Sequence, residues 1–289
     1  MAKTLVVLLA AALLACACAL PVERNRPAAA DAERVLAAIG SRSIVLLGEV
    51  HDNAAQHAMR EQALRRWIEG GARPILLMEQ FDREQQDELD RALARPGATA
   101  DAVIASAAAV SARPGQGWHW PFYRPYVALA IEYRLPIVAA NVSRADARRV
   151  ISEGLLALGF DPHVPPDVAV GQANEIVDGH CGQLDAADAR RLVPAQVARD
   201  QFMARMIERA GPRAVVLLAG NGHVRSDIGV PRWLKPATRE RSISIGLVES
   251  PASVDSMRFD RVLSTPEQPR ADPCAAMRAA PGAGGAVGR

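Results

Sequence analysis

The sequence has few aromatic residues and no run of basic residues. Phenylalanine, tryptophan and tyrosine make up 4% of its 289 residues, so any place where they gather is informative. The 34 lysines and arginines nearly balance the 32 aspartates and glutamates, and they form no continuous basic stretch. Because nucleic-acid-binding domains usually carry a basic face, we expect no nucleic-acid partner. The apolar content of 49% is ample for the core of one large domain.

Motifs of two common enzyme classes are also missing. The segment Gly220-Asn221-Gly222 lacks the later glycine and the Lys-Ser/Thr pair of a phosphate-binding loop. No Gly-x-Ser-x-Gly sequence occurs, which counts against the serine nucleophile of an α/β-hydrolase. Any chemistry must therefore come from other residues.

The N-terminus has the parts of a bacterial export signal. Lys3 supplies a positive charge, an apolar stretch runs over residues 5–14, and small residues follow around two cysteines. The apolar stretch is too short to predict a membrane span. An ordinary signal peptide cleaved after an alanine is one interpretation, and a lipoprotein signal is the other.

We favour the lipoprotein signal because residues 13–16 (LLAC) resemble a bacterial lipobox, whose cysteine is lipidated. Cys16 is preferred over Cys18 since a leucine stands three residues before it. Ala17, rather than an aspartate, follows Cys16, which predicts an anchor on the periplasmic face of the outer membrane in a Gram-negative organism. Acyl chains on Cys16 would make the membrane a partner of the protein. Residues 1–20 are thus expected to be the signal and lipidation site, and residues 21–34 a tether.

Five apolar segments alternate with helical patterns through the rest of the chain. The predicted strands are 43–49, 74–79, 136–141, 214–220 and 242–248, and the predicted helices follow Asp52 and Asp82 and cover about 98–112, 125–133, 143–158 and 194–210. Residues 160–183 show no clear period. This alternation predicts an α/β fold with a central, mainly parallel sheet and helices on both faces. We expect one domain over residues 35–250, a C-terminal segment over 251–278 and a disordered tail over 279–289.

Four predicted strands end in polar residues whose side chains can take part in catalysis or ligand binding. These residues are Glu49 and His51, then Glu79, then Asn141 and Arg144, and finally Asn221 and His223. In a parallel sheet the carboxyl ends of the strands meet at one edge, where ligands bind. One such residue is usually a helix cap, but four strands ending this way favour a functional cleft. Its polar lining is predicted as Glu79, Asn141, Arg144, Asn221 and, from the helix after Pro194, Asp200.

The same strand ends suggest a hydrolytic site. Glu49, His51 and His223 combine the side chains that bind a divalent metal or activate water as a general base. Their spacing is not that of a short zinc motif, so the metal prediction rests on residue type alone.

An aromatic cluster offers a different chemistry. Residues 118–126 (WHWPFYRPY) contain five of the twelve aromatic residues. His119, Tyr123 and Tyr126 are candidate haem-iron ligands, and Arg124 is a candidate partner for a haem propionate. The alternative is that the segment simply packs beneath the sheet. Of the remaining histidines, His57 is expected on a helix surface, and no specific role is expected for His163 or His180.

Seven short motifs occur in order along the chain. They are Gly48-Glu49-x-His51-Asp52-Asn53, Glu79-x-Phe81-Asp82, Trp120-x-x-Tyr123-x-Pro125, Asn141-x-x-Arg144, Gln196-x-x-Arg199-Asp200-x-x-Met203-Ala204, Gly220-Asn221-Gly222-His223-Val224 and Gly229-Val230-Pro231. Together they resemble the ChaN domain, a haem-binding uptake branch of the superfamily that includes Tiki and TraB proteins and erythromycin esterases. The resemblance covers roughly residues 35–250.

The resemblance implies a lipoprotein of haem and iron acquisition or storage. It implies a shared polar site at Glu49, His51 and His223, and it makes Tyr123 the first choice for the haem-iron ligand. A homodimer is plausible because a second copy would cover an exposed haem face. A metal-dependent peptidase or esterase is the second hypothesis, with a divalent metal as its cofactor, and a non-catalytic envelope scaffold is the third.

Export also bears on the last two cysteines. Cys181 and Cys274 would lie in an oxidising compartment, where a disulfide between them is favoured over two separate thiols. Both cysteines also suit exported members of the branch. Such a bond would tie the C-terminal segment back to the domain.

Overall fold

The computed structural model describes residues 26–111, 117–250, 258–272 and 274–275. The predicted signal and lipidation site, including Cys16, lies outside these residues, as does the predicted disordered tail. None of the helices within the described part of the chain combines the length and the apolar character needed to cross a membrane.

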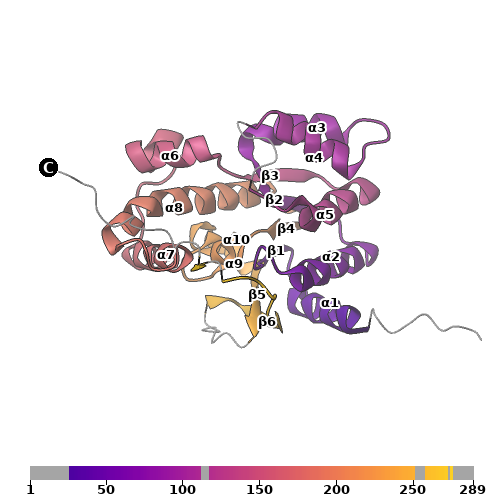
Figure 1. Cartoon of the computed structure of the whole chain (residues 1–289). Coiled ribbons are helices and arrows are strands. Elements are labelled where there is room, and N and C mark those ends of the chain that lie inside the picture. The colour runs from indigo at the N-terminus through magenta and orange to yellow at the C-terminus, as the bar shows by residue number, and fades with distance from the viewer. Residues whose placement is uncertain (1–25, 112–116, 251–257, 273, 276–289) are drawn as a thin grey trace, which may run out of the picture.

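A six-stranded parallel sheet forms the centre of the molecule (Figure 1). The strands are β1 (Ile44–Leu47), β2 (Ile75–Asp82), β3 (Ile137–Asn141), β4 (Val215–Leu218), β5 (Ser242–Ser250) and β6 (Arg261–Pro266). Their order across the sheet is β3-β2-β4-β1-β5-β6, and every neighbouring pair is parallel. The predicted α/β fold with a central parallel sheet is therefore confirmed.

Five of the six strands lie where the sequence predicts them, and β6 was not predicted. Every residue of β1 and β4 is buried, as expected for central strands covered on both faces. By contrast, β6 lies at the edge of the sheet, and Thr265 is the only one of its six residues that is buried. An edge strand with little burial needs no apolar run, so β6 left no clear signal in the sequence.

Helices cover both faces of the sheet. On one face pack α1 (Arg26–Ile39), α2 (Ala54–Glu69), α3 (Gln86–Leu93), α4 (Ala100–Ala109) and α5 (Trp120–Tyr133). On the other lie α6 (Arg144–Glu153), α7 (Pro166–Gly179), α8 (Ala186–Arg209), α9 (Asn221–Val224) and α10 (Pro236–Glu240). Short 3₁₀ turns at Arg83–Gln85, Leu155–Leu158 and Val230–Trp233 complete the chain.

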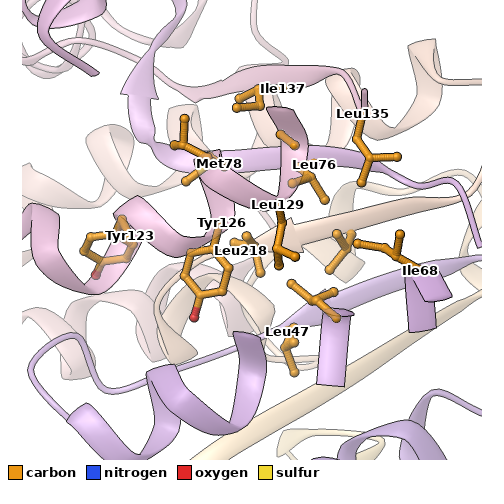
Figure 2. Packing of buried hydrophobic residues seen from close by; sticks show 14 of the residues in the cluster. Leu47, Ile68, Leu76, Met78, Tyr123, Tyr126, Leu129, Leu135, Ile137 and Leu218 are labelled. Atoms are coloured by element: carbon orange, nitrogen blue, oxygen red, sulfur yellow. The ribbon is translucent and has the colours of Figure 1, made fainter. Parts of the chain in front are cut away.

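Alternate residues of the strands supply the two cores. On the first face, Leu47, Met78 and Leu218 pack against Tyr126 and Leu129 of α5 (Figure 2). Neighbouring strand residues point the other way, toward Met203, Ala204 and Ile207 of α8. The period of two along each strand thus divides one apolar run between two helical layers.

Two predicted helices differ at their N-terminal ends, and α1 was not predicted as a helix. Two begin earlier than predicted, α5 at Trp120 and α8 at Ala186, so Pro125 and Pro194 lie inside helices rather than at their starts. Proline removes only one backbone hydrogen bond, and packing of the long α8 helix compensates for it. The first helix, α1, also includes residues 26–34, which the sequence analysis had given to the tether, because Ala32 is fully buried against the core.

A further helix lies in a stretch that showed no period. Helix α7 occupies Pro166–Gly179, with Val168, Gln172, Ala173 and Ile176 buried. These positions have helical spacing, but the prolines and glycines around them concealed it in the sequence.

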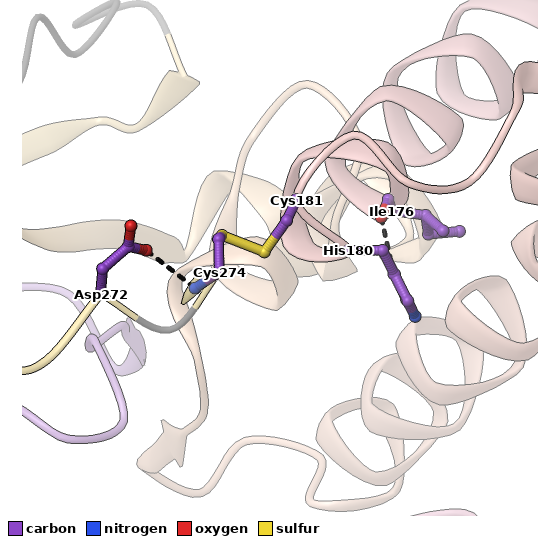
Figure 3. Close-up of a disulfide and its surroundings, with 5 residues drawn as sticks. All are labelled: Ile176, His180, Cys181, Asp272 and Cys274. Carbon is purple, nitrogen blue, oxygen red and sulfur yellow. Dashed lines mark hydrogen bonds between the residues drawn. A yellow bond between two sulfur atoms is a disulfide. The ribbon is translucent and has the colours of Figure 1, made fainter. Parts of the chain in front are cut away.

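The C-terminal segment is covalently tied to the domain. Cys181, after α7, and Cys274 form a disulfide (Figure 3), so the favoured pairing is present in the structure. Before it, Arg270 forms ion pairs with Asp52 and Glu249. The segment around Arg270 therefore touches the loop between β1 and α2 as well as the end of β5.

Breaking this disulfide should destabilise the fold. The bond joins residues 93 apart, so it restricts a long loop of the unfolded chain. We expect reduction, or the double substitution Cys181→Ser/Cys274→Ser, to lower the free energy of unfolding by about 2–4 kcal/mol. Urea denaturation with and without dithiothreitol measures the change. The double variant is the control and should not respond to reductant, and an unchanged wild-type midpoint on reduction would show that the disulfide contributes nothing to stability.

Candidate functional site

A cavity of about 610 Å³ opens at the carboxyl edge of the sheet. Residues that follow different strands reach it: His51 after β1, Glu79 in β2, Asn141 at the end of β3 and His223 after β4. The rest of the lining is Asp82, Glu84, Gln85, Val110, Ser111, Gly117, Trp118, Val142, Ser143, Arg144, Ala145, Arg148, Gln196 and Arg199. The structure thus brings together most of the polar residues that the strand ends suggested.

Glu49 is buried beside this cavity and organises one polar network. Its Oε2 forms an ion pair with Arg60, whose side chain is also fully buried. Its Oε1 accepts a hydrogen bond from the hydroxyl of Tyr123 at 2.7 Å and lies 3.0 Å from Nδ1 of His51. His57 Nδ1 lies 3.4 Å from Oε2. Glu49 therefore holds side chains from α2 and α5 and fixes the ring of His51.

His51 is the exposed member of this network. Its side chain is 51% exposed, and its ring meets the ring of Trp118 edge-on at 5.1 Å. Since Nδ1 faces Glu49, Nε2 is left without a hydrogen-bond partner among the described residues. The ring also lies against Gly220, where an added Cβ would come within 2.9 Å of Nε2. Only glycine allows this close approach, which explains one residue of the Gly-Asn-Gly-His motif.

His223 belongs to a second network at the same cavity. Its Nδ1 lies 2.6 Å from Oδ1 of Asp200, and its Nε2 lies 3.5 Å from Oε1 of Glu79. Gly220 N–H donates to the other oxygen of Glu79, and the amide of Gln172 donates to the other oxygen of Asp200. Both ring nitrogens of His223 therefore face carboxylates.

This arrangement favours a charged imidazole. Burial lowers the pKa of His223, but the charges and hydrogen bonds of Glu79 and Asp200 outweigh burial and raise that pKa to about 10. Burial likewise raises the pKa of Glu79, but His223 and the Gly220 N–H lower it to about 2. We conclude that His223 is an imidazolium near neutral pH.

The predicted metal ligands do not converge. The oxygens of Glu49 are engaged by Tyr123 and Arg60, whereas the nitrogens of His223 face Asp200 and Glu79. Across residues 26–111, 117–250 and the described C-terminal residues, no group of three or more His, Cys, Asp or Glu side chains is placed to hold a metal ion. The set Glu49, His51 and His223 is thus split between two networks, so its geometry gives no support to a metal-dependent hydrolase.

The aromatic segment packs mostly into the core, as its alternative interpretation supposed. Tyr126 is fully buried, and its hydroxyl donates to the carbonyl of His57, so the structure argues against it as a haem ligand. Tyr123 is 1% exposed with its hydroxyl on Glu49, and burial raises its pKa. Tyr123 and Tyr126, three residues apart in α5, therefore lie in the core, and neither lines the cavity.

The other predicted haem contacts lie outside the cavity lining. Arg124 is exposed and forms an ion pair with Asp101, and His119 is exposed and meets the ring of Phe122 edge-on at 4.6 Å between ring centroids. Asn221, predicted in the polar cleft, donates instead to the carbonyl of Leu247. Neither Arg124, His119 nor Asn221 is among the cavity residues.

Sequence reasoning missed two residues of α2. His57, predicted on a helix surface, is 4% exposed, and burial lowers its pKa to about 4. Arg60 is fully buried and also donates to the carbonyl of Leu47. They lie three residues apart and share a helix face with the buried Met59, Ala63 and Leu64, a spacing that could have revealed them.

The fold and the strand-end motifs together define an α/β protein with a polar cavity at the edge of its sheet. Comparison with known proteins agrees with this description. One family model matches residues 35–234, and its description is "Haem-binding uptake, Tiki superfamily, ChaN". The chain therefore belongs to this family. No curated protein sequence matches it significantly.

Two solved structures resemble this chain to different degrees. One is the structure of ChaN of Campylobacter jejuni with cofacially bound haem. It is 19% identical to this chain with a TM-score of 0.64, and the match covers 80% of this chain and 90% of that one. A mutant of erythromycin esterase EreC in its open conformation is 12% identical with a TM-score of 0.44, covering 78% and 77%. At 19% identity the likeness to the ChaN structure shows the fold alone.

The His223 network predicts an unusual pH dependence. Because the pKa of His223 is raised from 6.5 to about 10, its charge stabilises the fold fully below pH 6.5, and this contribution is lost as the pH rises toward about 10. NMR titration of the ring should show His223 protonated at pH 8. We expect Asp200→Asn to lower that pKa by at least about one pH unit, because it removes an adjacent negative charge. An imidazole signal that titrates near 6.5 in the wild type would contradict this assignment.

Proposed function

We propose that this protein binds haem in the cavity at the carboxyl edge of the sheet. The observation that carries the proposal is the placement of His51. Its Nδ1 faces the buried carboxylate of Glu49, and its Nε2 is open beside the cavity. An imidazole held in this way by a carboxylate is a common ligand for haem iron, because the carboxylate orients the ring and increases its basicity. Membership of the haem-binding uptake family supports the same proposal.

The cavity has surfaces that suit a flat macrocycle. Trp118 lies against His51, and Val110 adds apolar area to the lining. Val110 is 49% exposed, which is unusual for a large apolar side chain in this protein. A haem ring would cover such surface and remove it from water. Haem bound here supplies an iron centre for storage or transfer, and the protein supplies the ligand and the walls.

His51 rather than Tyr123 is the proposed iron ligand. A tyrosine binds ferric iron through its deprotonated oxygen, and burial raises the pKa of Tyr123, which opposes that state. The hydroxyl of Tyr123 is moreover committed to Glu49. We therefore give Tyr123 a positioning role, acting on His51 through Glu49.

Haem titration of the protein lacking residues 1–20 tests this proposal. We expect a saturable Soret shift in the wild type. His51→Ala should weaken binding by about tenfold or more, as expected when an iron ligand is lost, and should change the Soret maximum. Tyr123→Phe should keep the ligation, with at most a small loss of affinity. The exposed His163 provides a control, since His163→Ala should behave as wild type.

Two outcomes would contradict parts of the proposal. A wild-type protein without a saturable Soret shift would exclude haem binding. A Soret shift that is kept in His51→Ala and lost in Tyr123→Phe would identify Tyr123 as the iron ligand, as the family resemblance implied.

We further propose that the protein is an envelope lipoprotein of haem or iron acquisition or storage, anchored through Cys16. The predicted export signal and lipobox of residues 1–20 support this proposal. The disulfide between Cys181 and Cys274 is consistent with it, because disulfides persist in oxidising compartments. A homodimer that covers the outer face of the haem remains a prediction.

Metabolic labelling with a radioactive fatty acid tests the anchor. We expect the full chain to incorporate label, Cys16→Ser to abolish incorporation and Cys18→Ser to leave it unchanged, because only Cys16 follows the lipobox leucine at the correct spacing. Label that persists in Cys16→Ser and is lost in Cys18→Ser would move the anchor to Cys18. An unlabelled full chain would favour an ordinary signal peptide.

A further inference from the structure

We propose that one wall of the cavity is a carboxylate-binding subsite formed by Arg144, Arg148, Arg199, Asn141 and the N-terminus of α6. This inference rests on the proposed function for the source of its ligand, which would be the propionate groups of haem. The recognition chemistry itself is more general, because guanidinium groups and helix N-termini bind carboxylates and phosphates alike.

The three arginines that line the cavity lack carboxylate partners. Among the described residues, Arg144, Arg148 and Arg199 form no ion pair with Asp or Glu within 4.0 Å. Outward-facing arginines nearby do: Arg83 lies 2.7 Å from Asp146, and Arg149 lies 3.1 Å from Glu153. The guanidinium groups of the three cavity arginines are therefore free of ion pairs with described carboxylates, which leaves their charge available to an anionic ligand.

The start of α6 presents backbone donors to the same wall. Ser143, Arg144 and Ala145 all line the cavity, and the Ser143 hydroxyl caps the helix by accepting from the N–H of Asp146. The N–H groups of Arg144 and Ala145 have no intrahelical acceptor, because they belong to the first turn. The helix dipole adds partial positive charge at this end. Arg144 and Arg148, four residues apart, extend from one face of this helix.

Asn141 provides an independent sign of a ligand site on this wall. It lines the cavity at the end of β3, is 9% exposed, and its Oδ1 is buried with no hydrogen-bond partner. Buried polar atoms are nearly always satisfied, so a ligand is the simplest partner. Because a flip of the side-chain amide exchanges its oxygen and nitrogen, Asn141 can donate to a carboxylate oxygen from the same position.

The acidic residues of the cavity lining do not neutralise the positive charge of the three arginines. Glu79 faces the imidazolium of His223, and Glu84 lies 3.4 Å from Arg83. Asp82 is the acid without an ion pair, and burial raises its pKa to about 6. The unpaired positive charges thus outnumber the unpaired negative charge, so an anion is favoured along this wall.

Haem analogues separate this subsite from haem binding itself. The experiment uses the full chain in detergent, with detergent-only blanks, and three ligands: haem, haem dimethyl ester and inorganic phosphate. The variants are Arg144→Ala/Arg148→Ala and, as a matched control on the same helix, Arg149→Ala, whose side chain faces Glu153. Circular dichroism checks that each variant folds.

We expect the wild type to bind haem about tenfold or more tightly than the ester, since the ester has no carboxylates and tenfold corresponds to about one charge-assisted hydrogen bond. The double variant should lose this preference by weakening haem binding while leaving ester binding unchanged. Arg149→Ala should behave as wild type. Equal affinities of wild type and double variant for haem would overturn the subsite while leaving haem binding intact.

Phosphate binding tests the subsite independently if haem does not bind. If the wild type binds neither haem nor ester, the proposed function fails. Saturable phosphate binding, measured by calorimetry, that is lost in the double variant and kept in Arg149→Ala would then support an anion subsite for another ligand. Absence of both haem and phosphate binding would overturn the subsite as well.

Discussion

The buried ion pair between Glu49 and Arg60 is the interaction on which the candidate site depends. Both side chains are fully shielded from water, so neither charge would be tolerated without the other. Arg60 also donates to the carbonyl of Leu47, which links α2 to the end of β1. The remaining oxygen of Glu49 is thereby directed toward Tyr123 and His51. The single carboxylate of Glu49 thus fixes the positions of α2 and α5 relative to the end of β1.

This constraint divides the strand-end residues into two networks with different properties. In the first, His51 keeps one nitrogen on Glu49 and its side chain remains half-exposed. In the second, His223 lies between Glu79 and Asp200, which hold it as a cation at the edge of the cavity. Two histidines that look equivalent in the sequence therefore have different surroundings: one ring nitrogen of His51 has no partner among the described residues, whereas both ring nitrogens of His223 face carboxylates.

The aromatic cluster shows why spacing within a helix matters more than composition. Residues 118–126 contain several groups that can bind haem iron, but α5 begins at Trp120 and turns Tyr123 and Tyr126 into the core. Trp118, which precedes the helix, is the member of this cluster that lines the cavity. The arginines of the proposed carboxylate subsite come instead from α6 and α8, where the sequence showed no aromatic or glycine-rich signal. Their importance depends on the cavity that they share.

The sequence alone determined the parallel sheet, five of its strands, and the edge where polar residues gather. Apolar runs buried on both faces and the polar residues that end them are local patterns, and parallel pairing brings those ends together. It also pointed to the Cys181–Cys274 pair. Only the tertiary structure decided that Tyr123 and Tyr126 point inward, that His57 and Arg60 are buried, and that Arg144, Arg148 and Arg199 share one wall. These outcomes depend on where helices begin and on contacts between residues far apart in the chain, such as Glu49 with Tyr123, which no local pattern specifies.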